Sequence, residues 1–202
     1  MLRNMVALVV VAVVVSTLVA CALLVPPPPP PDPATLVTPT PTASPTPAFA
    51  WARGSEYSIV VRKDERTLTV YRHNEQTKVY PVVLGIASSG AKVYQGDLRT
   101  PEGVYRILSK HPHQRWSRFM LLSYPNDEDR GHYAMALSEG RVPIIDGRAP
   151  GIGSAVGIHG TDREDSNARG DDWTFGCVSL LNQHVAELYD IVPIGTPVLI
   201  VK

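Results

Sequence analysis

A long proline-rich stretch divides this chain and limits where a folded domain can lie. Six consecutive prolines run from Pro26 to Pro31, and a mixture of threonine, proline, serine and alanine continues to Pro47. Such a segment buries too little apolar surface to fold, and it favours extended polyproline geometry. We therefore predict a disordered, semi-rigid linker over residues 26–54 and one folded domain over residues 55–202.

The segment before the prolines is apolar. Residues 5–25 carry no charge and are long enough for one bilayer span, which needs about 20 residues. Arg3 precedes them and favours a cytoplasmic N-terminus with the remainder outside. An alternative is a lipoprotein signal, because residues 18–21 resemble a lipobox with Cys21 as the lipidated residue. Both interpretations make residues 1–25 a signal or membrane anchor and predict an extracytoplasmic domain in the bacterial cell envelope.

Charge and cysteine content exclude several classes of function. The chain has 19 basic and 19 acidic residues, so the basic surface of a nucleic-acid-binding protein is not expected. Two cysteines cannot form a disulfide framework. No pair of histidines has metal-ligand spacing on one helix face, so we predict neither a metal nor a cofactor.

The composition after the linker changes to alternating apolar and polar residues, which is typical of strands. We predict strands over residues 57–63, 67–73, 78–87, 103–109, 118–123 and 197–202. Residues 126–130 are predicted as a turn or the start of a helix. The clearest helix is expected over residues 183–192, with Asn182 as its N-cap and an apolar stripe of Val185, Leu188, Tyr189 and Val192.

The candidate catalytic residues lie within residues 157–182. Cys177 is the one cysteine outside the apolar segment, and His159 shares its loop system. Each alone is more often structural than catalytic. Together, each beside a glycine and separated by a polar loop, they form the minimal set for a cysteine nucleophile and its base. We predict that His159 favours the Cys177 thiolate, as a nearby imidazolium does.

Several segments together resemble the L,D-transpeptidase catalytic domain of the YkuD type. The first is the pattern His159-Gly160, a polar loop, then Gly176-Cys177. Residues 96–105 match the family's G-D-x-x-T-P-x-G-x-Y segment. Residues 123–126, followed by Asp129, are similar to a subgroup that carries a Y-P-N segment. The ending at residues 192–198 is also typical, and the resemblance covers residues 56–202.

The resemblance implies a mostly β, sandwich-like domain with one or two short helices that acts on peptidoglycan stem peptides. The thiolate of Cys177 would form a thioester, with His159 as the base and the Gly160 carbonyl as the third triad member. Backbone N–H groups of Gly176 and Cys177 would stabilise the oxyanion. An amine of a second peptide, or water, would resolve the thioester.

The chain departs from the family pattern on both sides of the cysteine. Phe175 replaces a common histidine, and Ser179 replaces a common arginine or asparagine that could hold a substrate carboxylate. Candidate substrate contacts are Tyr133, Met135, Trp173 and Ser179. Two alternatives stay open: a carboxypeptidase or wall-protein-detaching hydrolase with the same nucleophile, and a wall-binding module without turnover.

Overall fold

The computed structural model describes residues 49–87 and 89–202. The expected apolar anchor, the lipidation of Cys21 and the linker as far as residue 48 lie outside the described residues. The described residues begin with a short 3-10 helix, η2 (Phe49–Ala52), in the stretch expected to be linker. Ala52 of this helix is buried. Within residues 49–87 and 89–202, no helix has the length and apolar character needed to cross a membrane.

Eight strands form a single curled sheet in the order β3-β2-β1-β8-β4-β5-β6-β7. They are β1 (Tyr57–Arg62), β2 (Thr67–Arg72), β3 (Glu75–Pro81), β4 (Gly103–His113), β5 (Ser117–Leu122), β6 (Gly157–His159), β7 (Val178–Ser179) and β8 (Pro197–Val201). The predicted mostly β class is therefore confirmed, and the six predicted strand regions all contain strands.

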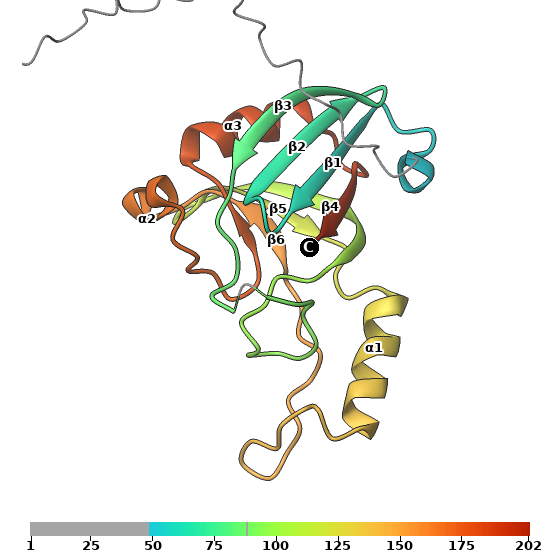
Figure 1. Cartoon of the computed structure of the whole chain (residues 1–202). Coiled ribbons are helices and arrows are strands. Elements are labelled where there is room, and N and C mark those ends of the chain that lie inside the picture. The colour runs from blue at the N-terminus through green and yellow to red at the C-terminus, as the bar shows by residue number, and fades with distance from the viewer. Residues whose placement is uncertain (1–48, 88) are drawn as a thin grey trace, which may run out of the picture. The chain divides into compact units, whose positions relative to one another are not determined.

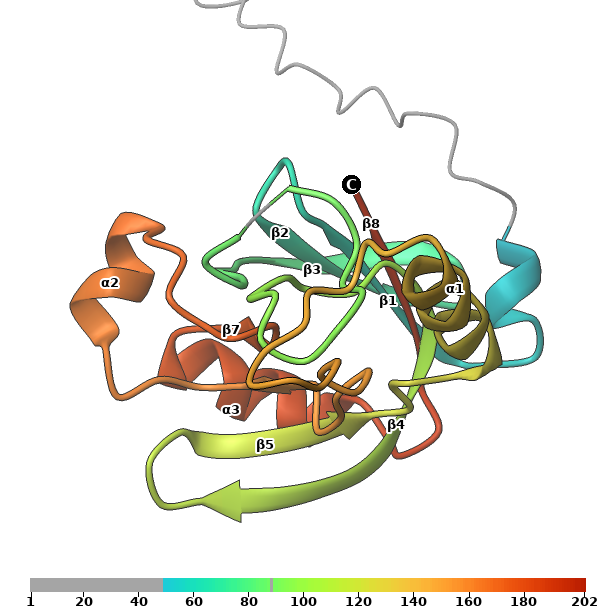
Figure 2. The ribbon, with the colours of Figure 1, turned by 90° about the horizontal axis from the view of Figure 1, so that it is seen from below.

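The long strand β4 makes the sheet curl. Its first part, Gly103 to Arg106, pairs with β8, and its second part, Ile107 to His113, pairs with β5. A register shift between Ile107 and Ser109 marks the change, and such an irregularity bends a strand. Figures 1 and 2 show β1–β3 and β4–β5 on opposite sides of the domain. Buried apolar side chains from both halves form one core between them.

Strands β2 and β3 meet in a tight hairpin. Arg72 pairs with Glu75, which leaves His73 and Asn74 as a two-residue turn. Both have positive φ, 51° and 68°, as the favoured two-residue hairpin turns require. Strand β3 therefore begins at Glu75, three residues before the strand predicted over residues 78–87.

Three α-helices accompany the sheet in the described part of the chain: α1 (Asp127–Ser138), α2 (Glu164–Arg169) and α3 (Asn182–Ile191). The sequence suggested one or two. Helix α3 buries Val185, Leu188 and Val192, as its apolar stripe predicts. The predicted N-cap is wrong. Leu181 occupies that position without a side-chain cap, because the Asn182 side chain accepts from the Thr161 N–H and donates to the Thr161 carbonyl, both at 2.8 Å.

Helix α1 starts at a capping box and projects from the strands (Figure 1). The Asn126 side chain accepts from the Asp129 N–H, and the Asp129 carboxylate accepts from the Asn126 N–H. The Tyr105 hydroxyl also donates to Asp129 at 3.0 Å. At the other end of the projecting segment, the Tyr124 hydroxyl donates to the Ile152 carbonyl at 3.0 Å. Both ends are therefore fixed to the domain, and the chain after Ile152 enters the site.

Candidate active site

His159 ends strand β6, and Cys177 comes directly before the neighbouring parallel strand β7. Ile158 of β6 pairs with Val178 of β7, and His159 pairs with Ser179. Cys177 comes one residue before β7 and is level with Gly157. Because side chains alternate between faces along extended backbone, Cys177 and His159 share one face of the sheet. The pairing of β6 with β7 thus places the backbone segments of the predicted nucleophile and base side by side.

The two glycines of the motif are required by close packing. A Cβ on Gly160 would lie 2.2 Å from Asn182 Oδ1 and 2.5 Å from the Trp116 carbonyl. Gly176 has a φ of +138°, and a Cβ there would lie 2.7 Å from the Arg99 carbonyl oxygen. Any side chain would push His159 or Cys177 away from these neighbours.

His159 is fixed as a neutral base. Its side chain is almost fully buried, and its Nδ1 lies 2.6 Å from the Gly160 carbonyl oxygen. A carbonyl only accepts, so Nδ1 carries the proton and Nε2 is free to take one. The imidazole stacks on Trp116 at 4.3 Å between ring centroids. Burial lowers the pKa of His159 to about 4, and the bond to Gly160 offsets this only in part.

The lowered pKa of His159 predicts how the free energy of unfolding depends on pH. His159 has a pKa of about 4 in the fold and 6.5 as its ordinary value, so the unfolded chain binds a proton first as the pH falls. The contribution of His159 to the free energy of unfolding is complete above pH 6.5, and it declines by about 3 kcal/mol as the pH falls towards 4. His159→Gln should remove this decline, measured by urea unfolding across that range, while the exposed His111→Gln should keep it. Parallel curves for His159→Gln and the wild type would contradict the neutral histidine.

Cys177 is a protonated thiol in this state. Burial raises the pKa of the Cys177 thiol, while a backbone hydrogen bond from Gly157 and the charge of Lys92 lower it in part. The sequence suggested that an imidazolium would favour the thiolate. The structure differs, because His159 is itself too buried to hold a proton. Both side chains are therefore uncharged in this structure.

Cys177 lies where two hollows meet. A cleft of about 590 Å³ is lined by Cys177, Phe175 and segments around Lys92, Gln95 and Ser154. A smaller pocket of about 220 Å³ is lined by His111, His113, Trp116, Phe119, Ala155 and Cys177. Sequence patterns alone could not group these histidines and aromatic residues, because they come from both strands of the β4–β5 hairpin and its turn. The thiol can therefore be approached by groups from two directions.

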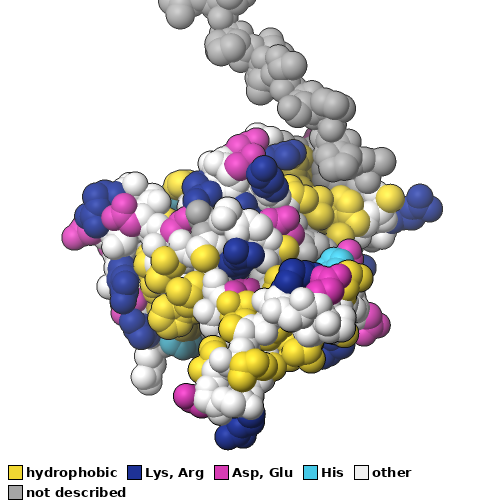
Figure 3. Space-filling model, turned by 60° about the horizontal axis from the view of Figure 1, so that its bottom comes forward, with side chains coloured by type: hydrophobic (Ala, Val, Ile, Leu, Met, Phe, Trp, Pro, Cys, Tyr) yellow, Lys and Arg dark blue, Asp and Glu magenta, His cyan; other side chains and the backbone are white. Residues whose placement is uncertain are grey.

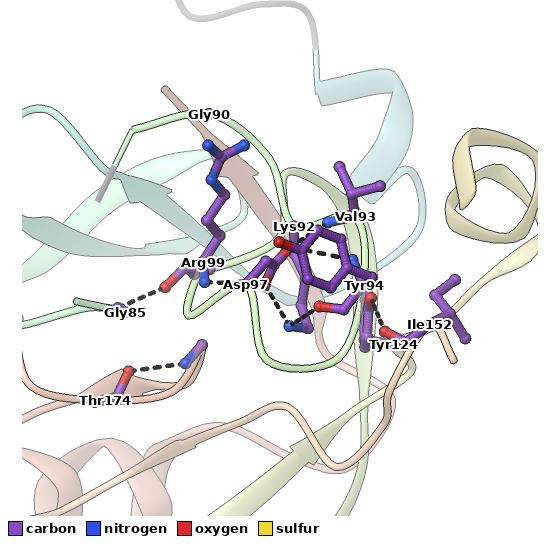
Figure 4. Close-up of polar contacts among 12 residues, drawn as sticks. Gly85, Gly90, Lys92, Val93, Tyr94, Asp97, Arg99, Tyr124, Ile152 and Thr174 are labelled. Atoms are coloured by element: carbon purple, nitrogen blue, oxygen red, sulfur yellow. Dashed lines mark hydrogen bonds and ion pairs between the residues drawn. The ribbon is translucent and has the colours of Figure 1, made fainter. Parts of the chain in front are cut away.

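A buried ion pair fixes one wall of the cleft. Lys92 Nζ donates to Asp97 Oδ1 at 2.7 Å and to the Tyr94 carbonyl at 3.0 Å, and both charged side chains are about 95% buried (Figure 4). Asp97 also accepts from the N–H groups of Val93 and Arg99. These hydrogen bonds outweigh the effect of burial and lower the pKa of Asp97. Asp97 belongs to the G-D-x-x-T-P segment, whose conformation it therefore sets.

Several predicted site residues have positions other than those expected. Ser179 is fully buried, and its hydroxyl bonds to Gly160 and Asn167 rather than lining the cleft. Although β7 is the last strand in the sheet order, the backbone of Val83 covers its outer side through a bridge to Ser179. The Gly176 N–H donates to Thr174 Oγ1 at 3.2 Å. This leaves the Cys177 N–H as the candidate oxyanion donor.

The remaining candidates lie on surface segments. The Tyr133 hydroxyl donates to the Pro150 carbonyl at 3.0 Å and ties α1 to the following segment. Met135 is 54% exposed on α1, and Phe175 is 75% exposed in the cleft wall. Figure 3 shows hydrophobic side chains gathered in patches between charged ones on one face of the molecule. The Trp173 ring lies edge-on to the His159 imidazole, with 5.9 Å between the ring centroids, so it packs beside the predicted base.

Among the residues that the structure describes, no group of three or more histidine, cysteine or acidic side chains could hold a metal ion. The chemistry available at the site is that of a thiol, an oriented neutral imidazole and backbone N–H groups. These groups suit acyl transfer through a covalent intermediate.

The fold and the site together define a catalytic domain of the cysteine type. The L,D-transpeptidase catalytic domain family (YkuD) matches residues 56–200, and the chain belongs to this family. The match contains the β4–β5 hairpin, the Lys92–Asp97 pair, His159 and Cys177. The family resemblance read from the sequence is therefore confirmed, whereas the Y-P-N subgroup stays a prediction.

Two relatives carry the L,D-transpeptidase name. YafK of Escherichia coli strain K12 is 27% identical over 145 residues, which are 69% of this chain and 48% of YafK. The chain thus spans about half the length of that relative. YqjB of Bacillus subtilis strain 168 is 28% identical over 142 residues, which are 70% of this chain and 69% of YqjB.

Two solved structures share the fold. Bd1075 of Bdellovibrio bacteriovorus superimposes with a TM-score of 0.51 at 23% identity, covering 73% of this chain and 48% of Bd1075. The helical cell shape determining protein Pgp2 of Campylobacter jejuni gives a TM-score of 0.51 at 20% identity, covering 71% of this chain and 46% of Pgp2.

Proposed function

We propose that this chain is a cysteine-dependent L,D-transpeptidase that acts on peptidoglycan stem peptides through a thioester. The observation that carries the proposal is the 2.6 Å bond from His159 Nδ1 to the Gly160 carbonyl, which leaves Nε2 as the basic nitrogen on the strand next to β7, the strand that follows Cys177. Membership of the family supports the reaction type. The cleft beside Cys177 supplies room for an extended peptide.

The reaction begins from the neutral pair. As Cys177 Sγ attacks the carbonyl of the third stem residue, its proton passes to His159 Nε2. The Cys177 N–H stabilises the resulting oxyanion. The intermediate collapses, the C–N bond to the terminal D-alanine breaks, and the departing amine takes the proton from Nε2. The amine of an acceptor, deprotonated by Nε2, then attacks the thioester and releases the thiol.

Hydrolysis of the same thioester is the alternative. Phe175 is an exposed, apolar part of the cleft wall, and the buried Ser179 does not line the cleft. The polar groups that could hold a second peptide beside the cysteine are therefore missing at both positions. This favours water as a competing acceptor and makes a carboxypeptidase or protein-detaching activity the second candidate.

The proposed location follows from the sequence. The catalytic domain, residues 55–202, would lie outside the cytoplasmic membrane in the bacterial envelope. Residues 5–25, or a lipid on Cys21, would anchor it, and the proline-rich linker would hold it away from the membrane. Treatment of intact cells with a protease that cannot enter the cytoplasm should remove the domain, and its survival would contradict this placement.

The experiment that separates the two candidates is product analysis. The purified full chain is incubated with disaccharide tetrapeptides, and the products are identified by mass spectrometry. We expect release of D-alanine together with cross-linked dimers and trimmed tripeptides. Tripeptides alone would assign the hydrolase. Unchanged tetrapeptides, with no reaction of Cys177 with a carbapenem, would leave only the wall-binding module.

A further inference from the structure

The buried hydroxyl of Ser179 belongs to a chain of hydrogen bonds that ends at the catalytic base. Ser179 Oγ donates to the Gly160 carbonyl oxygen at 3.0 Å. The same oxygen accepts from His159 Nδ1 at 2.6 Å. The carbonyl that orients the base is thus held by two donors on separate strands, and Ser179 is the strand partner of His159.

The chain continues from Ser179 to the loop that carries α2. Asn167 Nδ2 donates to Ser179 Oγ at 3.1 Å, and Trp173 Nε1 donates to Asn167 Oδ1 at 2.8 Å. The donors run in one direction, from Trp173 through Asn167 and Ser179 to Gly160. Hydrogen bonds aligned in this way polarise one another, and burial strengthens each of them.

We propose that Ser179 and Asn167 are positioning residues for His159, which they hold through the Gly160 carbonyl. Both are buried, with 0% and 7% exposure, so neither can contact a stem peptide. Without the Ser179 hydroxyl, the carbonyl keeps a single donor and the imidazole loses its fixed direction. A misplacement of about 1 Å at a reacting group can lower a rate about 100-fold.

The proposal also accounts for the unusual residue at this position. Family members commonly carry a larger polar side chain two residues after the cysteine. Here a small serine fits a fully buried position on β7, and Asn167 and Trp173 complete the hydrogen bonds from the α2 segment. The inference rests on the proposed function in assigning His159 as the base, but its test requires no peptidoglycan.

The test measures alkylation of the Cys177 thiol by iodoacetamide, a reaction in which the thiol must give up its proton and His159 Nε2 is the proposed acceptor. The full chain is used, and labelling is read at Cys177 by peptide mass spectrometry since Cys21 is a second thiol. In Ser179→Ala we expect the rate to fall by about 10- to 100-fold. Ser179→Thr, which keeps a hydroxyl, should recover part of it.

The matched control removes another buried hydroxyl. Thr196 is 3% exposed and donates to the Pro193 carbonyl at 2.7 Å. Neither residue belongs to the hydrogen-bond chain that runs from Trp173 to the Gly160 carbonyl. Thr196→Val should alkylate like the wild type. The imidazole Nδ1 proton of His159, observed by NMR, should shift or exchange faster in Ser179→Ala and stay unchanged in Thr196→Val. If the loss of a buried hydroxyl acted only by destabilising the fold, Ser179→Ala and Thr196→Val would alkylate at similar rates.

Trp173→Phe provides a variant that keeps the ring and deletes the outermost donor. We expect the alkylation rate of Cys177 to decrease less, by about two- to fivefold, because the hydrogen-bond chain to Gly160 loses only its first donor. Should Ser179→Ala fail to fold, this variant and the NMR signal decide the question. Wild-type alkylation and an unshifted Nδ1 proton in the folded variants would overturn the inference.

The two proposals can fail separately. Slow alkylation in Ser179→Ala combined with no reaction on muropeptides would preserve the positioning role and reject the proposed substrate. The wild type could instead turn over muropeptides while the variants keep its kcat and its alkylation rate. That result would support the proposed substrate and reject the positioning role. Where turnover is measured, kcat should fall in Ser179→Ala while KM stays the same.

Discussion

Cys177→Ser is expected to abolish turnover while the domain remains folded. A serine hydroxyl is far harder to ionise than a thiol, and His159, with a pKa of about 4, is too weak a base to compensate. We expect kcat on stem peptides to fall by about three orders of magnitude or more. Stopped assays of D-alanine release from tetrapeptides provide the measurement.

The control for this variant is Cys21→Ser, which removes the other thiol of the chain. It should retain the turnover of the wild type, and both variants should melt at the same temperature. Comparable turnover by Cys177→Ser, in a preparation free of wild-type protein, would reject Cys177 as the nucleophile.

Lys92→Met is expected to destabilise the domain more than the loss of any exposed ion pair. Lys92 and Asp97 have side chains only 5% and 4% exposed, so the variant leaves Asp97 as a buried charge without its partner. Removing one member of such a pair costs about 3–5 kcal/mol. For a domain of this size the melting temperature should fall by roughly 10 °C, measured by calorimetry.

A matched pair at the surface supplies the control. Arg72 and Glu56 form an ion pair whose side chains are 54% and 47% exposed, and exposed pairs contribute little. Arg72→Met should therefore leave the melting temperature nearly unchanged. The double variant of Lys92→Met and Asp97→Asn should recover part of the loss. Equal melting temperatures for Lys92→Met and Arg72→Met would show that the buried pair does not fix the loop.

Local patterns in the sequence predicted the strands and the last helix, although four consecutive residues of both β1 and β2 are buried rather than every second one. Alternation identified β1 and β2, and the stripe of Val185 and Leu188 identified α3. The N-cap was wrong because Asn182 has a competing partner, Thr161, 21 residues earlier in the chain. A preference for helix caps cannot anticipate a partner that only the fold brings near.

The site was predictable where the motif itself carries the chemistry. His159, Cys177 and their glycines could be assigned from residue type and order. The ionisation of the pair could not, because it depends on the burial that Trp116 and neighbouring residues produce. Ser179 looked like a substrate contact since nothing in its sequence neighbourhood reveals that Val83, far earlier in the chain, covers it.

The central claim is that Cys177 carries the stem peptide as a thioester, and the mass of the intact protein tests it most directly. The full chain is mixed with disaccharide tetrapeptide, stopped with acid and analysed at once. We expect an adduct with the mass of the substrate less D-alanine, located at Cys177 and absent from Cys177→Ser. Turnover of the peptide without any such adduct, or the same adduct on Cys177→Ser, would contradict the claim.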